Sequence, residues 1–152
     1  MLNIKDELLG AVRAMNEAGV PYAICGGMAV VLHGYPRLTR DIDILIEPLG
    51  LDGAMRALAS VGFDISGGTL PFDIGKEHER HIRRVSKVVG ADILTVDLLL
   101  VPDFLKDVWD ARERYEVADV SVWAVSRAGL VKMKKIAGRP RDLDDIETLE
   151  GL

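Results

Sequence analysis

Two aspartates stand two residues apart at the start of an apolar, β-branched run, Asp41-Ile42-Asp43 followed by Ile44 to Ile46. A run of this composition favours a β-strand. Because side chains alternate between the two faces of a strand, Asp41 and Asp43 point to the same face. Two neighbouring carboxylates repel each other unless a cation lies between them, and Mg²⁺ prefers oxygen ligands. The pair therefore predicts a strand that carries a site for Mg²⁺, or for Mn²⁺.

A glycine pair precedes this strand. A short apolar strand is expected over 22–25, then Gly26 and Gly27, then a short helix over 28–32. Glycines let the backbone approach a ligand closely, and a helix N-terminus offers free N–H groups and partial positive charge. A lone Gly-Gly is more often a simple tight turn. The carboxylate pair downstream favours a phosphate-binding turn instead.

A third carboxylate, Asp97, lies inside the apolar run 93–101. An ionised side chain is costly to bury there without a partner. If its strand lies beside the aspartate pair, three carboxylates converge, enough to hold two metals about 3.5–4 Å apart for in-line phosphoryl transfer. The alternative is an ion pair with Arg83, Arg84 or Lys134. We favour the metal interpretation.

Helical and strand-like patterns alternate along the chain. We expect helices over residues 2–18, 28–32, 51–60, 103–110, 127–137 and 141–149, strands over 22–25, 42–46, 81–89 and 93–101, and a hairpin over 115–125. The glycine-rich stretch 62–79 is expected to be irregular, with one short strand at most. Interleaved helices and antiparallel hairpins favour an α+β or mixed α/β fold with a single mixed sheet flanked by helices. No repeat or linker divides residues 1–152, so one domain is expected.

Composition narrows the function classes. The net charge of −5 argues against a protein that binds nucleic acid through overall charge. A single cysteine, Cys25, leaves no internal disulfide, which favours a cytoplasmic location. The N-terminus is charged and amphipathic, unlike a signal peptide. No apolar run approaches the roughly 18 residues that a membrane span needs, so no membrane partner is expected.

The order of these motifs resembles the nucleotidyltransferase superfamily of the polymerase-beta-like fold. Its signature is Gly-[Gly/Ser], a gap, Asp-x-[Asp/Glu], and a third Asp on a later strand. The match here is Gly26-Gly27, Asp41-Ile42-Asp43 and Asp97. Within the superfamily, the chain is most similar to the AbiEii-type toxin group. That similarity rests on Gly26–Ala29, His33-Gly34, Arg37, Thr39–Asp43 and the C-terminal segment Leu130–Ile146.

The resemblance implies a nucleoside triphosphate such as ATP, and Mg²⁺-dependent transfer of a nucleotidyl group to a hydroxyl of RNA (tRNA, for example), protein or a small molecule. It also implies a toxin–antitoxin role with a cognate antitoxin. Asp97 would activate the attacking hydroxyl, and Asp142 would hold basic side chains in place. Residues 62–89 match nothing in the family. Metal binding and catalysis fall to Asp41, Asp43 and Asp97, and nucleotide binding to Gly26, Gly27, Thr39, Arg40 and Lys134.

Several features have two interpretations. Lys134 shares a helix side with apolar residues, so it faces inward and needs an anion, either an aspartate or a phosphate. His33 is a substrate contact or a structural histidine. His78 and His81 are weak zinc candidates, and a surface loop is favoured. A basic strand is either an exposed hairpin face or a track for triphosphate or acceptor; its members are Arg80, Arg83, Arg84 and Lys87.

The whole chain also has a second interpretation. It is short, with the catalytic motifs and little room for a separate acceptor-recognition domain. It would then be a catalytically inactive module of the same fold that binds a nucleotide or a partner protein.

Overall fold

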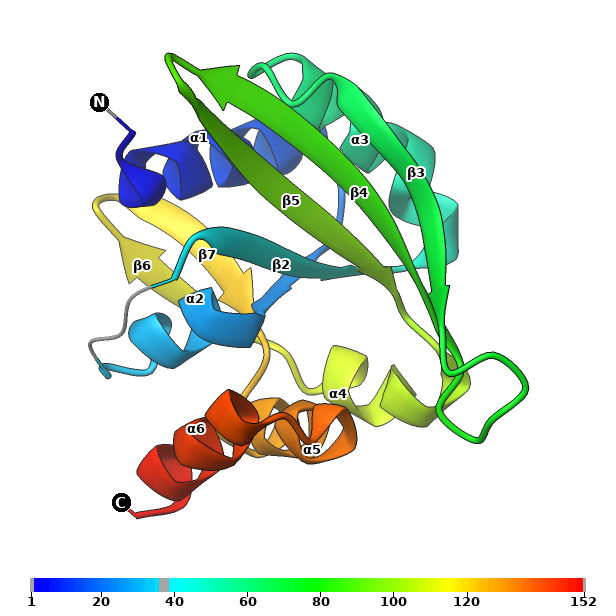
Figure 1. Cartoon of the computed structure of the whole chain (residues 1–152). Helices are drawn as coiled ribbons and strands as arrows, with labels where there is room; N and C mark the ends of the chain where they lie inside the picture. Colours follow the sequence, from blue (N-terminus) through cyan, green and yellow to red (C-terminus); the bar gives the residue numbers. More distant parts are fainter. Residues whose placement is uncertain (1, 36–38, 152) are drawn as a thin grey trace.

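Seven strands form one mixed sheet in the computed structural model, which describes residues 2–35 and 39–151 (Figure 1). Their order is β3-β4-β5-β2-β1-β7-β6. The pairs β2–β5 and β1–β7 are parallel, and the other pairs are antiparallel. The strands are β1 Ala23–Cys25, β2 Asp41–Ile46, β3 Ile65–Phe72, β4 Arg80–Val89, β5 Asp92–Leu100, β6 Glu113–Val117 and β7 Val120–Ala124.

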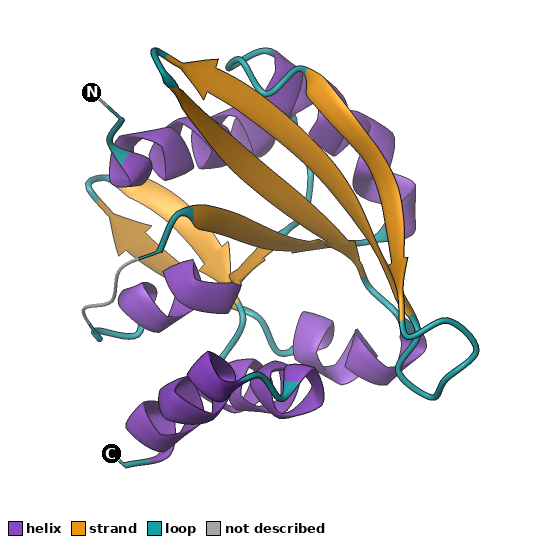
Figure 2. Ribbon diagram, in the orientation of Figure 1, coloured by secondary structure: helices purple, strands orange, loops and turns teal. Residues whose placement is uncertain are grey.

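Helices flank the sheet, which confirms the expected mixed α/β fold (Figure 2). They are α1 Ile4–Glu17, α2 Gly26–Leu32, α3 Leu51–Ala59, α4 Lys106–Asp110, α5 Arg127–Ala137 and α6 Pro140–Glu150, with 3-10 turns η1 Pro48–Gly50 and η2 Asp103–Leu105. The two helices α1 and α3 pack together on one side, and α2, α5 and α6 lie on the other (Figure 1). In the part of the chain described, no helix has both the length and the apolar character needed to cross a bilayer.

The central strands bury one apolar face and carry the aspartates on the other. Along β2, Ile42, Ile44 and Ile46 are fully buried, whereas Asp41 is exposed and Asp43 is partly buried. The neighbouring strand β5 repeats the pattern, with buried Val96 and Leu98 on either side of a partly exposed Asp97. Burial of the apolar face fixes the register of each strand. The same burial therefore directs all three aspartates to the opposite face.

Two elements differ from the sequence expectation. The expectation of an irregular 62–79 stretch is wrong for β3, which forms an eight-residue strand. It is an edge strand with mostly exposed residues and a register shift between Ser66 and Gly68, so it lacks the apolar alternation that identifies a strand. Helix α2 begins at Gly26 instead of residue 28, so both glycines belong to its first turn.

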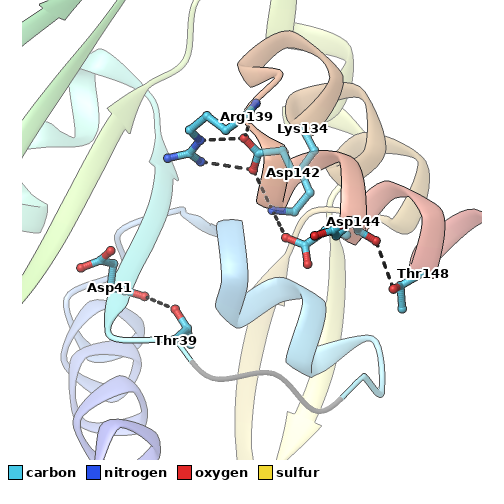
Figure 3. Close-up of polar contacts among 8 residues, drawn as sticks. Thr39, Asp41, Lys134, Arg139, Asp142, Asp144 and Thr148 are labelled. Atoms are coloured by element: carbon cyan, nitrogen blue, oxygen red, sulfur yellow. Dashed lines mark hydrogen bonds and ion pairs between the residues drawn. The ribbon is translucent and has the colours of Figure 1, made fainter.

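A buried ion network joins α5 to α6 (Figure 3). Lys134 is buried, as its position on the helix predicted, and its Nζ lies 2.9 Å from Asp145 Oδ2 and 3.4 Å from Asp142 Oδ1. Arg139 Nε donates to Asp142 Oδ2 at 2.7 Å. Asp142 thus holds two basic side chains, the role that the family resemblance gave it.

The start of α2 passes directly beside β2. Gly26 has φ +63°, and a Cβ at this position would overlap the Asp43 carboxylate and lie 3.0 Å from Asp43 Cβ. Positive φ and close approach both require glycine here. Gly26 therefore lets the helix start and the carboxylate occupy the same corner of the fold.

Replacing Lys134 by Met is expected to lower the free energy of unfolding by about 3–5 kcal/mol, since it leaves buried carboxylates without their shared cation. The matched control is Lys135→Met. Lys135 also pairs with an α6 carboxylate, Glu150 at 3.1 Å, but it is 60% exposed. Its loss should cost under about 1 kcal/mol. Urea unfolding of both variants checks this, and equal losses would show that burial of Lys134 contributes nothing.

Replacing Gly26 by Ala is expected to destabilise the fold more than Gly19→Ala does. Both glycines have positive φ, +63° and +68°, but a Cβ at Gly19 meets nothing within 4 Å. Gly19→Ala should cost about 1–2 kcal/mol for the left-handed backbone. Gly26→Ala should add about 1–3 kcal/mol for the collision with Asp43. Thermal unfolding measures the difference, which vanishes if the contact with Asp43 is unimportant.

Candidate functional site

A row of polar side chains crosses four neighbouring strands on the face opposite α1 and α3. The register pairs Arg84 of β4 with Asp97 of β5, Asp97 with Asp43 of β2, and Asp43 with Cys25 of β1. Residues paired across strands share a face of the sheet. Asp41 precedes Asp43 by two residues and joins them on that face. The structure therefore brings together the three aspartates that the sequence selected.

This row opens into a cavity of about 400 Å³ between the sheet and the α5–α6 pair. The volume is within the range of small-molecule sites in proteins, about 300–1,000 Å³. The lining comprises acidic Asp41, Asp43, Asp97 and Asp142, basic Arg80, Arg84, Lys134, Arg139 and Arg141, and Cys25, Gly26, Phe72, Ile82, Leu99, Leu130, Met133 and Ala137.

Both walls of the cavity carry charges of both signs, because β4 adds Arg80 and Arg84 to the sheet wall and α6 adds Asp142 to the other. The carboxylates of β2 and β5 lie on the sheet, and basic side chains come from β4 on one side and from the α5–α6 region on the other. A ligand that joins anionic groups to a cation could match both walls. A metal-bound polyphosphate has this chemistry.

Asp43 is the most perturbed carboxylate of the cavity. Burial, together with the negative charges of Asp97 and Asp41, raises the pKa of Asp43 to about 6, although Arg139 and Lys134 oppose the shift. Proximity to like charges in a partly buried site favours the neutral acid. A cation bound beside Asp43 would remove this penalty, and hard carboxylate oxygens are ligands that suit Mg²⁺ or Mn²⁺.

Asp97 has a basic partner. Arg84 Nε lies 2.8 Å from Asp97 Oδ1, and Arg84 Nη2 lies 3.1 Å from Oδ2. Of the three ion-pair partners that the sequence left open, the structure selects Arg84. The hydrogen bond to Asp97 raises the pKa of the Arg84 guanidinium. Both oxygens of Asp97 are thus engaged.

The three carboxylates are chemically suited to a hard cation, but Asp97 is already bonded to Arg84. Asp41, Asp43 and Asp97 offer oxygen ligands on adjacent strands of one cavity wall. Within residues 2–35 and 39–151, however, no group of three or more His, Cys, Asp or Glu side chains is arranged to hold a metal ion. At Asp97, the oxygens that a metal would need are hydrogen-bonded to Arg84.

The remaining predicted nucleotide-binding residues divide into two groups. Gly26 and Lys134 line the cavity, whereas Gly27, Thr39 and Arg40 are not part of its lining. Thr39 Oγ1 donates to the backbone oxygen of Asp41 at 3.3 Å, so it supports the start of β2 (Figure 3). Arg37, part of the family motif, lies outside the described residues.

The basic strand divides between the two faces of the sheet. Arg80 and Arg84 line the cavity, which agrees with the proposed track. Arg83 donates to Thr69 Oγ1 at 3.1 Å, and Lys87 Nζ lies 2.8 Å from Glu7 Oε2 of α1, on the opposite side. The period-2 alternation of a strand could have separated these two pairs from the sequence alone.

Arg139, Arg141 and Phe72 line the cavity although the sequence analysis gave them no individual role. Arg139 and Arg141 follow the helix-ending Gly138, and Phe72 lies in the stretch that matched no family. Their signal was weak, because the positions of Arg139 and Arg141 depend on where the turn between α5 and α6 lies, and that of Phe72 depends on the unexpected strand β3.

The histidines have structural surroundings. His33 Nε2 lies 3.0 Å from the Val125 backbone oxygen, and its ring meets Tyr115 edge-on. His78 packs on the Phe104 ring at 4.8 Å. No histidine is among the lining residues of the cavity, so the structural interpretation of His33 is supported.

No protein-family model and no characterised protein matches this sequence. Solved structures do match in three dimensions. The protein TM1012 of Thermotoga maritima, a candidate nucleotidyltransferase, aligns with a TM-score of 0.65 at 14% identity, over 99% of this chain and 94% of that one.

Two antibiotic-modifying enzymes also match. The lincosamide antibiotic adenylyltransferase LnuA, solved with lincomycin, gives a TM-score of 0.62 at 18% identity and 95% coverage of both chains. ANT(2")-Ia, solved with adenylyl-2"-tobramycin, gives 0.58 at 14% identity, over 93% of this chain and 84% of that one. The mixed sheet flanked by helices is therefore a nucleotidyltransferase-like fold.

Proposed function

We propose that this chain is a Mg²⁺-dependent nucleotidyltransferase that moves a nucleotidyl group from a nucleoside triphosphate to a hydroxyl acceptor. The observation that carries the proposal is the row of Asp41, Asp43 and Asp97, which faces a cavity with basic walls. The nucleotidyltransferase-like fold supports it.

Asp41 and Asp43 would hold the metal, with Asp97 as a further ligand. When bound, Mg²⁺ would neutralise phosphate charge and orient the reacting oxygens. The N–H groups at the start of α2, where Gly26 lies against the Asp43 carboxylate, would approach the metal-bound phosphates. Arg139 and Arg141, from the opposite wall, would pair with the remaining phosphate oxygens.

In the transfer step, the acceptor hydroxyl oxygen attacks the α-phosphorus and forms a new P–O bond. The bond from this phosphorus to the bridging oxygen breaks, and pyrophosphate leaves with the electron pair. The hydroxyl proton passes to a carboxylate, for which Asp97 is the candidate. The cavity residues act mainly by positioning and charge stabilisation, as phosphoryl chemistry requires.

The proposal also concerns which molecule supplies the acceptor hydroxyl. RNA such as tRNA, a protein and a small molecule are all hydroxyl acceptors of the proposed reaction. An AbiEii-type assignment and a cognate antitoxin partner rest on the resemblance of the segment Leu130–Ile146, whose Lys134, Arg139 and Asp142 form the network between α5 and α6. The antitoxin is tested by asking whether the protein encoded by a small adjacent reading frame co-purifies with this chain.

The second candidate is a catalytically inactive module that binds a nucleotide or a partner. The pairing of Asp97 with Arg84 favours it, since the candidate base is engaged by a cation. It predicts nucleotide binding without turnover.

Transfer should be detected when the chain is incubated with each α-labelled nucleoside triphosphate, Mg²⁺, and tRNA, tobramycin or lincomycin as acceptor. Asp43→Asn should lower the rate at least about 10²-fold, since it removes charge where the metal acts. Asp52→Asn in the first turn of α3 is the control and should leave the rate unchanged. Triphosphate binding without transfer to any acceptor would favour the inactive module, and an unchanged rate for Asp43→Asn would exclude the proposed site.

Asp43→Asn should also stabilise the metal-free protein at neutral pH. The pKa of Asp43 is raised to about 6 in the fold. The folded state therefore holds a proton that the unfolded chain loses near pH 4, so wild-type stability falls as pH rises from about 4 to 6. The variant lacks this loss and should gain up to about 3 kcal/mol at pH 7.5, with no gain below about pH 4.

Thermal unfolding across this pH range, with and without Mg²⁺, measures the effect. Mg²⁺ should stabilise the wild type more than Asp43→Asn, because the ion relieves the same repulsion. Asp41→Asn, at an exposed carboxylate, is the comparison and should give a smaller gain. A gain that does not vary with pH would contradict this account of Asp43.

A further inference from the structure

One contact in the cavity has no part in the transfer step described above. The Arg84 guanidinium meets the Asp97 carboxylate through two parallel hydrogen bonds, 2.8 and 3.1 Å long. This geometry uses both oxygens of Asp97 and is the strongest arrangement for such a pair. The Arg84 side chain is 43% exposed, whereas that of Asp97 is 15% exposed. The arginine is therefore the partner more accessible to solvent.

Arg84 and a divalent metal would both bind the carboxylate oxygens of Asp97. The guanidinium keeps its charge at every pH at which the protein is folded, so it cannot withdraw by losing a proton. A metal ion at Asp97 would use the same oxygens, and two cations on one carboxylate repel each other. Among the described residues, neither Asp41 nor Asp43 forms an ion pair with an arginine or lysine. Competition is thus confined to one of the three carboxylates.

Once displaced, Arg84 remains within the cavity. It lines the same space as Gly26 and Lys134, and Arg139 also lines that space. A polyphosphate in that space would offer the guanidinium the same planar pair of oxygen acceptors that Asp97 offers.

We propose that Arg84 is a positioning residue with two successive partners. It holds Asp97 in place while no metal is bound, and it transfers to the anionic polyphosphate when the metal takes Asp97. This inference rests on the proposed function, because it requires a metal at the aspartates and a phosphate ligand. It predicts that the loss of Arg84 strengthens metal binding but weakens polyphosphate binding.

The neighbouring Arg83 provides a matched control. It belongs to the same strand and carries the same charge, but it donates to Thr69 on the other face of the sheet and does not line the cavity. Arg83→Gln and Arg84→Gln change the net charge equally. A difference between them therefore reports the contact with Asp97 and not the overall charge.

The first measurement is Mn²⁺ binding to the nucleotide-free chain, by calorimetry or by the electron paramagnetic resonance signal of free Mn²⁺. Arg84→Gln is expected to bind Mn²⁺ about tenfold more tightly than the wild type, because the competing bidentate pair is gone. Arg83→Gln should remain within about twofold of the wild type, since its charge is distant and screened.

The second measurement is the binding of inorganic tripolyphosphate at saturating Mn²⁺. Here Arg84→Gln should bind about tenfold more weakly, for loss of a charge-assisted pair. Arg84→Lys should lie between wild type and Arg84→Gln in both measurements, because lysine keeps the charge but not the fork. If Arg84 had a purely structural role, its loss would weaken the binding of Mn²⁺ and of tripolyphosphate together. Tighter Mn²⁺ binding with weaker tripolyphosphate binding is therefore the diagnostic result.

The inference is overturned if Arg84→Gln changes Mn²⁺ affinity no more than Arg83→Gln does, or if it weakens both ligands. Asp43→Asn separates this failure from that of the proposed function. If the wild type binds no Mn²⁺, or Asp43→Asn binds it equally well, the proposed metal site fails and the inference fails with it. Circular dichroism checks folding, and Arg84→Lys supplies the same comparison if Arg84→Gln does not fold.

Discussion

The parallel pairing of β2 with β5 is the constraint from which the rest of the site follows. It sets Asp43 directly beside Asp97 on one face of the sheet, with Asp41 two residues away. Three neighbouring carboxylates in a partly buried wall repel one another, and burial together with this repulsion raises the pKa of Asp43. Each nearby feature compensates for it. Gly26 leaves room for the Asp43 carboxylate, and Arg84 neutralises Asp97.

The apolar face of the same strands maintains this arrangement. Ile42 and Ile44 are fully buried between β2 and the helices on the other side, as are Val96 and Leu98 of β5. A one-residue slip would turn these side chains to the cavity and the aspartates into the core, so the register is strongly specified. Burial of each large apolar side chain contributes about 1.5–3 kcal/mol, which is enough in sum to outweigh the repulsion among the carboxylates.

The sequence could predict those parts of the fold and site whose causes are local. The alternation in β2 predicted the shared face of Asp41 and Asp43. The helix expected over 127–137 is confirmed as α5, with Ser126 as its N-cap and Gly138 as its left-handed C-cap. Features that depend on packing between distant segments could not be predicted in the same way. The choice of Arg84 as the partner of Asp97 depends on the β4–β5 register. The position of Arg139 on the cavity wall depends on where the turn between α5 and α6 lies.

The same repulsion links stability to function at this site. A fold that places uncompensated carboxylates together is less stable in the metal-free state. A ligand that binds only the folded state restores that stability by mass action. Arg84 can offset the cost at Asp97, but it cannot do so at Asp43, which lies one strand further from β4. Burial and the charges of Asp97 and Asp41 therefore still penalise the ionised form of Asp43, and Asp41 lies beside it on the same strand. A cation has most to gain at this pair, so the first metal should enter there, with Asp97 joining only after Arg84 has found another anion.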